Sequence, residues 1–294
     1  MVRRKALQTA VSLWGLIAGC WPAHGQNVIG QGVDLGELHR ALAPRMARSE
    51  TGLPLLITSE ELSGRLSGQV LATLDIPFDR LRAAMEKPET WCEILILHLN
   101  TKHCVLLPGA TPVLRMAIAR KHDHSAGQSQ HLDLTWRMLK STPASISVGL
   151  AADTGPLGTS DYRVSFQAIP VDADRSFVAF GYSSQFTATA RMAMLAYLAT
   201  WGSNKVGFSR AADGQSLVTG LRGVVERTAM RYYLGINAWF DGTERPAAER
   251  RRYRFERWFY LTELYPRQLR EVDRATYLTD KLSAESRQSG TSSQ

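Results

Sequence analysis

The most regular pattern of apolar positions lies between Leu217 and Asp241. Apolar residues recur there at spacings of three and four, which predicts one long amphipathic helix. Its apolar face consists of Leu217, Leu221, Val224, Thr228, Tyr232, Ile236 and Trp239, widened by Val218, Val225, Ala229, Tyr233 and Phe240. Its polar side is expected to carry Arg222, Glu226, Arg227 and Arg231. A helix with so wide an apolar face needs a broad apolar surface to pack on.

The middle of the chain supplies that surface, because it has the pattern of a run of strands. Strand-like segments occur at 53–59, 68–76, 104–107, 112–120, 132–139, 145–151, 161–169 and 176–184. Turn signals separate the later segments, which indicates a meander of adjacent antiparallel strands. In the strand 161–169, one face is expected to carry Tyr162, Val164, Phe166 and Ala168. In the next strand, one face is expected to carry Phe177, Ala179, Gly181 and Ser183. The pattern predicts an α+β fold in which a curved antiparallel sheet packs on the long helix.

Shorter helical patterns surround this unit and set the expected domain boundaries. Helices are predicted at 34–49, 77–87, 188–201, 246–260 and 266–282, while the apolar run 91–97 fits a helix or a strand. We therefore expect an N-terminal helix and linker at 26–52, the main domain at 53–241 and a C-terminal helical appendage at 242–282. The polar segment 283–294 is predicted to be disordered.

The order of these elements resembles the START-like, or helix-grip, superfamily. The resemblance begins with an alternating strand that ends in Asp75-Ile76-Pro77-Phe78-Asp79-Arg80-Leu81, followed by a short helix and Trp91. The strands 132–184 and a long closing helix complete it, so it covers roughly residues 53–241. It implies an apolar cavity between sheet and helix that binds a lipid or another hydrophobic molecule. The helix at 188–201 and the helices after residue 241 depart from the family pattern.

The N-terminus has the pattern of a signal peptide. Arg3, Arg4 and Lys5 precede an apolar run that ends near Gly19, too short for a comfortable membrane span. Residues 1–25 are therefore expected to direct export to the periplasm or envelope of a Gram-negative bacterium. Two cleavage sites compete: one before Cys20, which would make that residue a lipidated N-terminus, and one before Gln26.

The cysteines and the charge narrow the picture further. Cys92 and Cys104 remain as an even pair after export, so we expect a disulfide between them, with two reduced, buried thiols as the alternative. The net charge of +8 falls when the basic signal residues are removed, and export argues against a nucleic-acid partner. The cluster Glu249–Arg254 fits a solvated helix face or a contact with phospholipid headgroups.

No catalytic or metal motif is complete. His122, Asp123 and His124, with His131 nearby, fit a polar loop as well as a zinc site. His98 and His103 could pair with a nucleophilic Cys92 or Cys104, which a disulfide would remove. The Gly-x-Ser-x-Gly elbow and a Gly-rich phosphate loop are missing from the sequence, so we expect no catalytic residue, no bound metal and no cofactor.

The remaining candidates are residues that could line a cavity. They are Trp136, Phe166, Phe177, Tyr182, Arg231, Tyr232 and Trp239. The aromatic side chains fit either a cavity wall or a packed core, and Arg231 fits either a headgroup ligand or an ion-pair ladder with Glu226 on the wet face. The sequence predicts a binder of a lipid or other hydrophobic small molecule. An enzyme on the same fold and an accessory envelope protein without a ligand are the alternatives.

Overall fold

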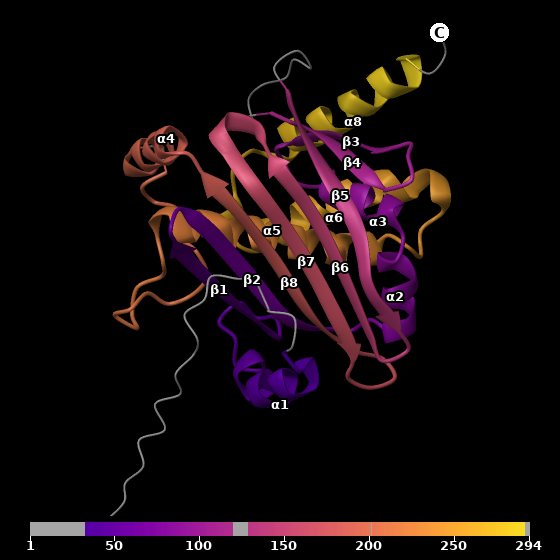
Figure 1. Cartoon of the computed structure of the whole chain (residues 1–294), viewed down its shortest axis with the longest axis horizontal. Helices are drawn as coiled ribbons and strands as arrows, with labels where there is room; N and C mark the ends of the chain where they lie inside the picture. The colour runs from indigo at the N-terminus through magenta and orange to yellow at the C-terminus, as the bar shows by residue number, and fades with distance from the viewer. Residues whose placement is uncertain (1–32, 120–128, 201, 292–294) are drawn as a thin grey trace, which may run out of the picture.

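One antiparallel sheet forms the centre of the molecule. The computed structural model describes residues 33–119, 129–200 and 202–291, with side chains described as far as Ser283. In this part of the chain the strands lie in the order β1-β2-β8-β7-β6-β5-β4-β3. They are β1 (Leu55–Leu62), β2 (Arg65–Leu74), β3 (Thr101–Leu107), β4 (Val113–Ile118), β5 (Gln130–Thr142), β6 (Ser145–Thr154), β7 (Thr159–Pro170) and β8 (Ser176–Phe186). Figure 1 shows this sheet in front of the long helix.

The two faces of the sheet differ because successive side chains of a strand point to opposite sides. Phe166 of β7 pairs with Phe180 of β8, and both are buried in the main core on the inner face. On the outer face, the neighbouring pair is Ser165 and Gly181, so the side chains are small at this point of the outer face. The core of the domain therefore lies between the inner face and the helices.

Helix α5 (Gly220–Asp241) packs against the inner face of the sheet at β1, β2 and β8. The approach to β2 is close: a Cβ added at Gly68 would lie 2.9 Å from the carbonyl oxygen of Val225. The helix begins at Gly220, not at the expected Leu217. Gly220 has a φ of +60°, which glycine adopts readily, and Leu217 instead forms an isolated bridge with Arg210.

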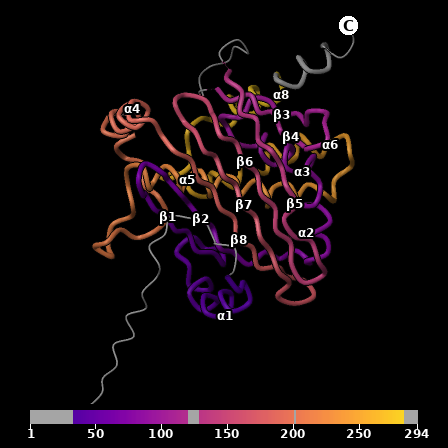
Figure 2. The backbone as a smooth tube through the Cα atoms, in the orientation of Figure 1, coloured from indigo at the N-terminus to yellow at the C-terminus, as the bar shows by residue number. Residues whose placement is uncertain are grey.

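Shorter helices close the ends of the sheet. The helices α2 (Phe78–Met85) and α3 (Pro88–Leu95) connect β2 to β3, so the undecided run near Trp91 is helical, with Pro88 in its first turn. Helix α1 (Leu35–Met46), capped by Asp34, packs on the outer face of the sheet. Helix α4 (Ala188–Ala199) follows β8 and lies at the edge of the molecule in the cartoon and in the backbone tube (Figures 1 and 2).

A further layer covers the side of α5 that faces away from the sheet. It consists of α6 (Ala247–Glu263), α7 (Pro266–Leu269) and α8 (Arg274–Thr291). The single helix expected at 266–282 is thus wrong: the chain breaks after Leu269, and Asp273 caps a new helix by accepting from the Thr276 amide at 2.9 Å. Helix α8 also continues to Thr291, beyond the expected boundary at Leu282.

The predicted α+β fold is confirmed by this arrangement. A curved antiparallel sheet packs on one long helix, and extra helices follow it in the chain. From one side of the molecule to the other, the layers are α1, the sheet, α5 and the group α6–α8. The C-terminal layer is the feature that changes the environment of α5 most, because it removes the wet face that the sequence pattern suggests.

Candidate functional site

The inner face of the sheet meets α5 in a cluster of aromatic rings. Tyr232 of α5 lies 5.9 Å from Tyr182 and 6.1 Å from Phe180, measured between ring centroids. Tyr162 lies 6.2 Å from Tyr182 on the neighbouring strand. Burial raises the pKa of the Tyr182 and Tyr232 hydroxyls, so both stay protonated and act as neutral hydrogen-bonding groups.

His98 adds a titratable group to this cluster. Its ring stacks on Tyr232 at a centroid distance of 5.0 Å, and the residue is 7% exposed. Its Nδ1 accepts a hydrogen bond from the Asn100 amide at 3.2 Å, which places the proton of the neutral ring on Nε2. Nε2 is buried and has no hydrogen-bond partner among the described residues. Burial, and then the charges of Arg231 and Lys281, hold the pKa of His98 well below its ordinary value, so the ring is neutral.

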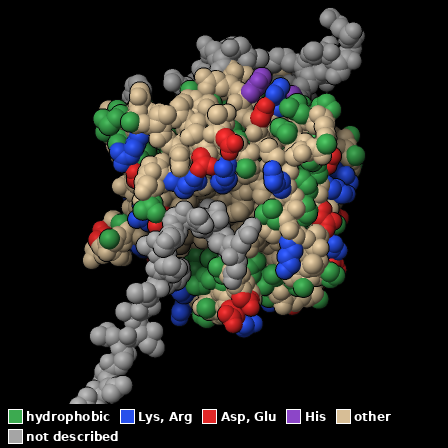
Figure 3. Space-filling view, in the orientation of Figure 1, with side chains coloured by type: hydrophobic (Ala, Val, Ile, Leu, Met, Phe, Trp, Pro, Cys, Tyr) green, Lys and Arg blue, Asp and Glu red, His purple; other side chains and the backbone are tan. Residues whose placement is uncertain are grey.

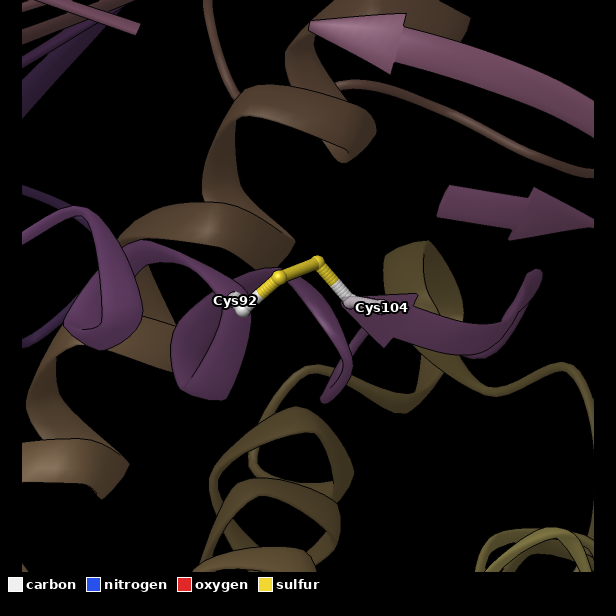
Figure 4. Close-up of a disulfide and its surroundings, with 2 residues drawn as sticks. All are labelled: Cys92 and Cys104. Carbon is white, nitrogen blue, oxygen red and sulfur yellow. A yellow bond between two sulfur atoms is a disulfide. The ribbon is translucent and has the colours of Figure 1, made fainter. Parts of the chain in front are cut away.

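The turn that carries His98 is fixed from two sides. The disulfide between Cys92 of α3 and Cys104 of β3 closes the segment around it (Figure 4). This pair was expected from the sequence, and the structure confirms it. From the other side, Lys281 of α8 donates to the carbonyl oxygens of Ile96, His98 and Thr101 at 2.6–2.7 Å.

Two further contacts from α8 support the same turn. The Tyr277 hydroxyl donates to the Leu97 carbonyl at 2.8 Å, and Lys102 pairs with Asp280 at 3.2 Å. Burial lowers the pKa of Lys281, while its three carbonyl acceptors favour the ammonium form. The C-terminal appendage therefore positions the histidine of the interior, although it lies outside the sheet and α5.

Four of the predicted cavity residues do lie on the inner side of the sheet. Phe166 packs edge-on against Trp91 at 5.6 Å, and Tyr182 and Tyr232 belong to the aromatic cluster. Trp136 of β5 is buried in the same core, and its Nε1 has no hydrogen-bond partner among the described residues. These residues form a continuous apolar core that contains isolated polar atoms.

Phe177 is not among them, and its assignment to the cavity is wrong. It lies on the outer face of the sheet with Leu71 and Ala179, where α1 covers it. Its ring is 4.9 Å from that of His39. Phe177 and Tyr182 are five residues apart in one strand, so the alternation of side chains places them on opposite faces.

Trp239 is also outside the interior cluster. The C-terminal part of α5 packs on α3, where Gly235 approaches Ile94. Trp239 donates from Nε1 to Glu93 at 2.6 Å, and the guanidinium of Arg254 lies 4.6 Å from its ring centroid. It is a partly exposed side chain at the junction of α3, α5 and α6.

Arg231 follows neither of the two expectations for it. The residue is buried, but it points away from the sheet, toward the C-terminal layer. Its guanidinium donates to the Leu269 carbonyl and to Glu271, both at 3.1 Å. Consecutive residues of a helix are rotated by about 100°, so Arg231 and Tyr232 cannot share one face. An anionic headgroup in the aromatic cluster would not meet this arginine.

The expected ladder of charges on a wet helix face is wrong as well. Glu226 and Arg227 are buried, because the segment 206–209 and the C-terminal layer cover this side of α5. Burial lowers the pKa of Arg227 to about 10, and its guanidinium donates to the Val206 carbonyl at 3.3 Å. Glu226 accepts four hydrogen bonds from Ser59, Phe208 and Ser209.

The candidates for other chemistry have different outcomes. No group of three or more possible metal ligands occurs within the described residues, and His122, Asp123 and His124 lie outside them. The disulfide leaves Cys92 and Cys104 without a free thiol, so neither serves as a nucleophile in this state. Burial lowers the pKa of His103, whose Nε2 has no partner among the described residues.

Two hollows lie on the far side of α5 from the sheet. The larger is an open groove of about 620 Å³ between α6 and the start of α8. Charged side chains on its walls are engaged with each other or with neighbours, as in the pairs Arg270–Glu263 and Arg274–Glu256. The smaller one holds about 10 Å³ beside Leu99 and Tyr277. Among the described residues, no helix is long and apolar enough to span a bilayer.

Comparisons with known proteins add the following. A scan against family models and a search of curated proteins returned no match. Among solved structures, norcoclaurine synthase from Thalictrum flavum is 11% identical with a TM-score of 0.33, over 50% of this chain and 80% of that one. A START superfamily protein from Mycobacterium smegmatis is 13% identical with a TM-score of 0.31, over 45% of this chain and 91% of that one.

The Zhui aromatase/cyclase from a Streptomyces species is 11% identical with a TM-score of 0.32, over 69% of this chain and 95% of that one. Because these scores are low, the helix-grip arrangement is established by the chain's own sheet and α5. No activity is transferred from these proteins to this chain.

Proposed function

We propose that the chain binds a small hydrophobic molecule between the inner face of the sheet and α5, beside His98 and Tyr232. The observation that supports this is the Nε2–H of His98, which is buried against an aromatic wall and has no partner in the part of the chain that the structure describes. A buried donor without a partner costs about 1–3 kcal/mol. An acceptor oxygen on a bound molecule would remove that cost, while the surrounding rings bury its apolar part.

The test is native mass spectrometry of the purified protein, followed by extraction of any bound molecule. Wild type is expected to carry a hydrophobic molecule and to bind anilinonaphthalene sulfonate as a competing probe. His98→Phe keeps a ring of similar shape but removes the donor, and it should reduce retention by about tenfold. His39→Phe, the same substitution on the outer face near Phe177, is the matched control and should retain the molecule.

One observation favours the alternative of an accessory protein without a ligand. Trp91, Phe166 and Phe180 fill much of the space between the sheet and the helices, and all three are buried. Under that alternative, wild type carries no extractable molecule, and His98→Phe is at least as stable as wild type. An enzyme on this fold would instead alter the extracted molecule or a close analogue of it during incubation, and His98→Phe would abolish the change.

We also propose that the protein is exported to the bacterial envelope. The basic and apolar N-terminal pattern supports this, and so does the disulfide, since structural disulfides are typical of oxidising compartments. Intact mass of the protein from the envelope fraction tests it. A polypeptide that starts at Gln26 excludes lipidation, whereas a lipid adduct on Cys20 demonstrates it. Unprocessed chain in the cytoplasm would contradict export.

A further inference from the structure

Helix α4 presents an apolar surface that nothing in the described chain covers. Its inner side packs on Leu66, Leu221 and Val225 through Leu198, with Met194 and Leu195 beside it. Its outer side is exposed over its whole length. The exposed residues of the helix and its C-cap are Ala188, Thr189, Met192, Ala193, Ala196, Tyr197, Ala199 and Thr200.

None of these exposed residues is charged, and the one charged side chain of the helix, that of Arg191, is 42% exposed. Its guanidinium turns back to Glu61 of β1, with contacts of 2.7 and 3.1 Å. The large apolar residue Met192 is 65% exposed. A surface helix normally has a polar outer face, so a helix that is apolar all round requires an apolar neighbour on its outer side. Figure 3 shows hydrophobic side chains gathered over α4.

A second element extends the same surface. The turn at Pro156–Gly158 contacts α4, since the Thr187 amide donates to the Gly158 carbonyl at 2.9 Å. Leu157 in this turn is 56% exposed, and Gln130 fixes its backbone by accepting from its amide at 2.9 Å. We call Leu157 together with the exposed residues of α4 the α4 patch. Two separate segments of the chain thus direct apolar groups to one area.

We propose that the α4 patch docks on a lipid bilayer, with α4 lying in the boundary between headgroups and acyl chains. A 12-residue helix is about 18 Å long and about 10 Å wide, which gives an outer face of about 200 Å². A stable interface with a second copy of the chain buries about 800 Å² on each partner, so this patch is too small for one. Interfacial helices bind membranes through an apolar face of this size, and Tyr197 suits the headgroup level.

The position of α4 agrees with a bilayer as the occupant. Tyr182 belongs both to the aromatic cluster at His98 and to the cluster under α4. The patch therefore lies over the end of the proposed ligand site, where a hydrophobic molecule would pass between protein and membrane. The docking itself does not depend on that site, and its test is separate.

The test is flotation of the mature protein that starts at Gln26, without the apolar signal segment and Cys20, with vesicles of phosphatidylethanolamine and phosphatidylglycerol. Wild type should float with the vesicles, and it should do so equally in low and high salt, because the patch is uncharged. The double variant Met192→Gln with Leu157→Gln should bind at least about tenfold less. The matched control is Leu139→Gln with Leu264→Gln, which are 52% and 50% exposed and lie on β5 and beyond α6. It should float like wild type.

Four outcomes would overturn the proposal. They are failure of wild type to float, equal losses in the two double variants, binding that disappears in high salt, and a dimer in sedimentation experiments that only the patch variant abolishes. The third would assign binding to surface arginines, and the fourth would assign the patch to a second copy. Circular dichroism must show that both variants are folded. Loss of flotation with unchanged ligand retention separates this proposal from the one concerning His98.

Discussion

Glu226 illustrates how this protein accommodates a charge in its interior. Its Oε1 accepts from the hydroxyls of Ser59 and Ser209, both at 2.5 Å, and its Oε2 accepts from the amides of Phe208 and Ser209 at 2.7 and 2.9 Å. Four donors compensate much of the cost of removing a carboxylate from water. The carboxylate thereby attaches the segment 206–209 to α5 and to β1.

Glu226→Gln should therefore destabilise the protein strongly. The amide oxygen of glutamine can still accept from the amides of Phe208 and Ser209, and its nitrogen can donate to the two serine hydroxyls, but the side chain is neutral and all four bonds lose their charge assistance. We expect the free energy of unfolding, measured in urea, to fall by about 3 kcal/mol. Glu249→Gln on the exposed side of α6 is the control and should stay within about 0.5 kcal/mol of wild type. Similar values for the two variants would mean that the hydrogen bonds at Glu226 contribute little.

His98 should make stability depend on pH. Its pKa in the folded protein lies well below the ordinary value of 6.5, mainly because of burial. As the pH falls below 6.5, the unfolded chain binds a proton at His98 that the folded chain does not bind, so protonation favours unfolding. The contribution of the neutral His98 to the free energy of unfolding is complete above pH 6.5. It is lost as the pH falls toward the folded pKa, at about 1.4 kcal/mol per pH unit.

The pH effect is measured as a difference between wild type and His98→Phe. Urea unfolding at several pH values should show that the stability of wild type relative to the variant falls below pH 6.5, because the unfolded variant takes up no proton at position 98. His39 and His103 also have lowered pKa values, but they are present in both proteins and cancel. Parallel stability curves across this range would contradict a neutral, buried His98.

The position of a single side chain was predictable from the sequence only where one local rule, such as the alternation along a strand, determined it. Alternation along β8 separates Phe177 from Tyr182 without any structure, so the error at Phe177 came from choosing aromatic residues by type alone. The missing partner of His98 was not predictable, since it depends on α3, β3, α5 and α8 meeting at one point. Its position between two cysteines was the available signal.

At the scale of elements, α5 shows why a broad apolar face is informative. The sequence predicts its length and its contact with the sheet, both of which depend on local periodicity. The face was wider than one sheet requires, and the structure explains this because α5 also contacts α6 and α7 on its other side. Arg227 and Arg231 were misplaced because a count of charges along a helix does not reveal a second covering layer.

Helix α8 stabilises the turn at His98 through Lys281. Substitution to methionine would preserve the length of the side chain but leave three buried carbonyl groups without their donor. We expect Lys281→Met to lower the free energy of unfolding by about 3 kcal/mol. Hydrogen exchange of amides in residues 97–104 should accelerate more than exchange in β7, because the turn loses its support first.

The control for this variant is Lys140→Met, which removes an exposed lysine at the end of β5. It should change stability by no more than about 0.5 kcal/mol. Uniform acceleration of exchange throughout the Lys281→Met protein would mean that α8 supports the whole domain and not this turn in particular.

At the scale of the whole molecule, the sheet, α5 and the group α6–α8 share one core, while α1 packs on the outer face in a smaller cluster. The order of strands and the closing helix followed from local patterns and from the resemblance of element order to a known superfamily. The placement of α6–α8 did not, because nothing local in residues 242–291 specifies which surface they cover. Buried hydrogen bonds fix the position of these helices. Trp258 donates to α5, and Tyr277 and Lys281 donate to the turn at His98.

The disulfide is the covalent connection in this arrangement, and its removal should affect both stability and ligand retention. Cys92 and Cys104 are 12 residues apart, and closing a loop of this size restricts the unfolded chain. In the loop-entropy model, the double variant Cys92→Ser with Cys104→Ser should lose about 3 kcal/mol. Wild-type protein should contain no thiol that reacts at these positions under denaturing, non-reducing conditions.

The position of the bond predicts a second effect that loop entropy alone does not. His98 lies inside the closed segment, so the double variant should retain less of the extracted hydrophobic molecule even where it is fully folded. Ligand retention is compared at a temperature well below the unfolding transition, with Lys140→Met as a folded control. Because α8 still supports the turn through Lys281, we expect partial loss, smaller than that of His98→Phe. Unchanged retention would show that α8 alone positions His98, and that the disulfide acts only on the unfolded state.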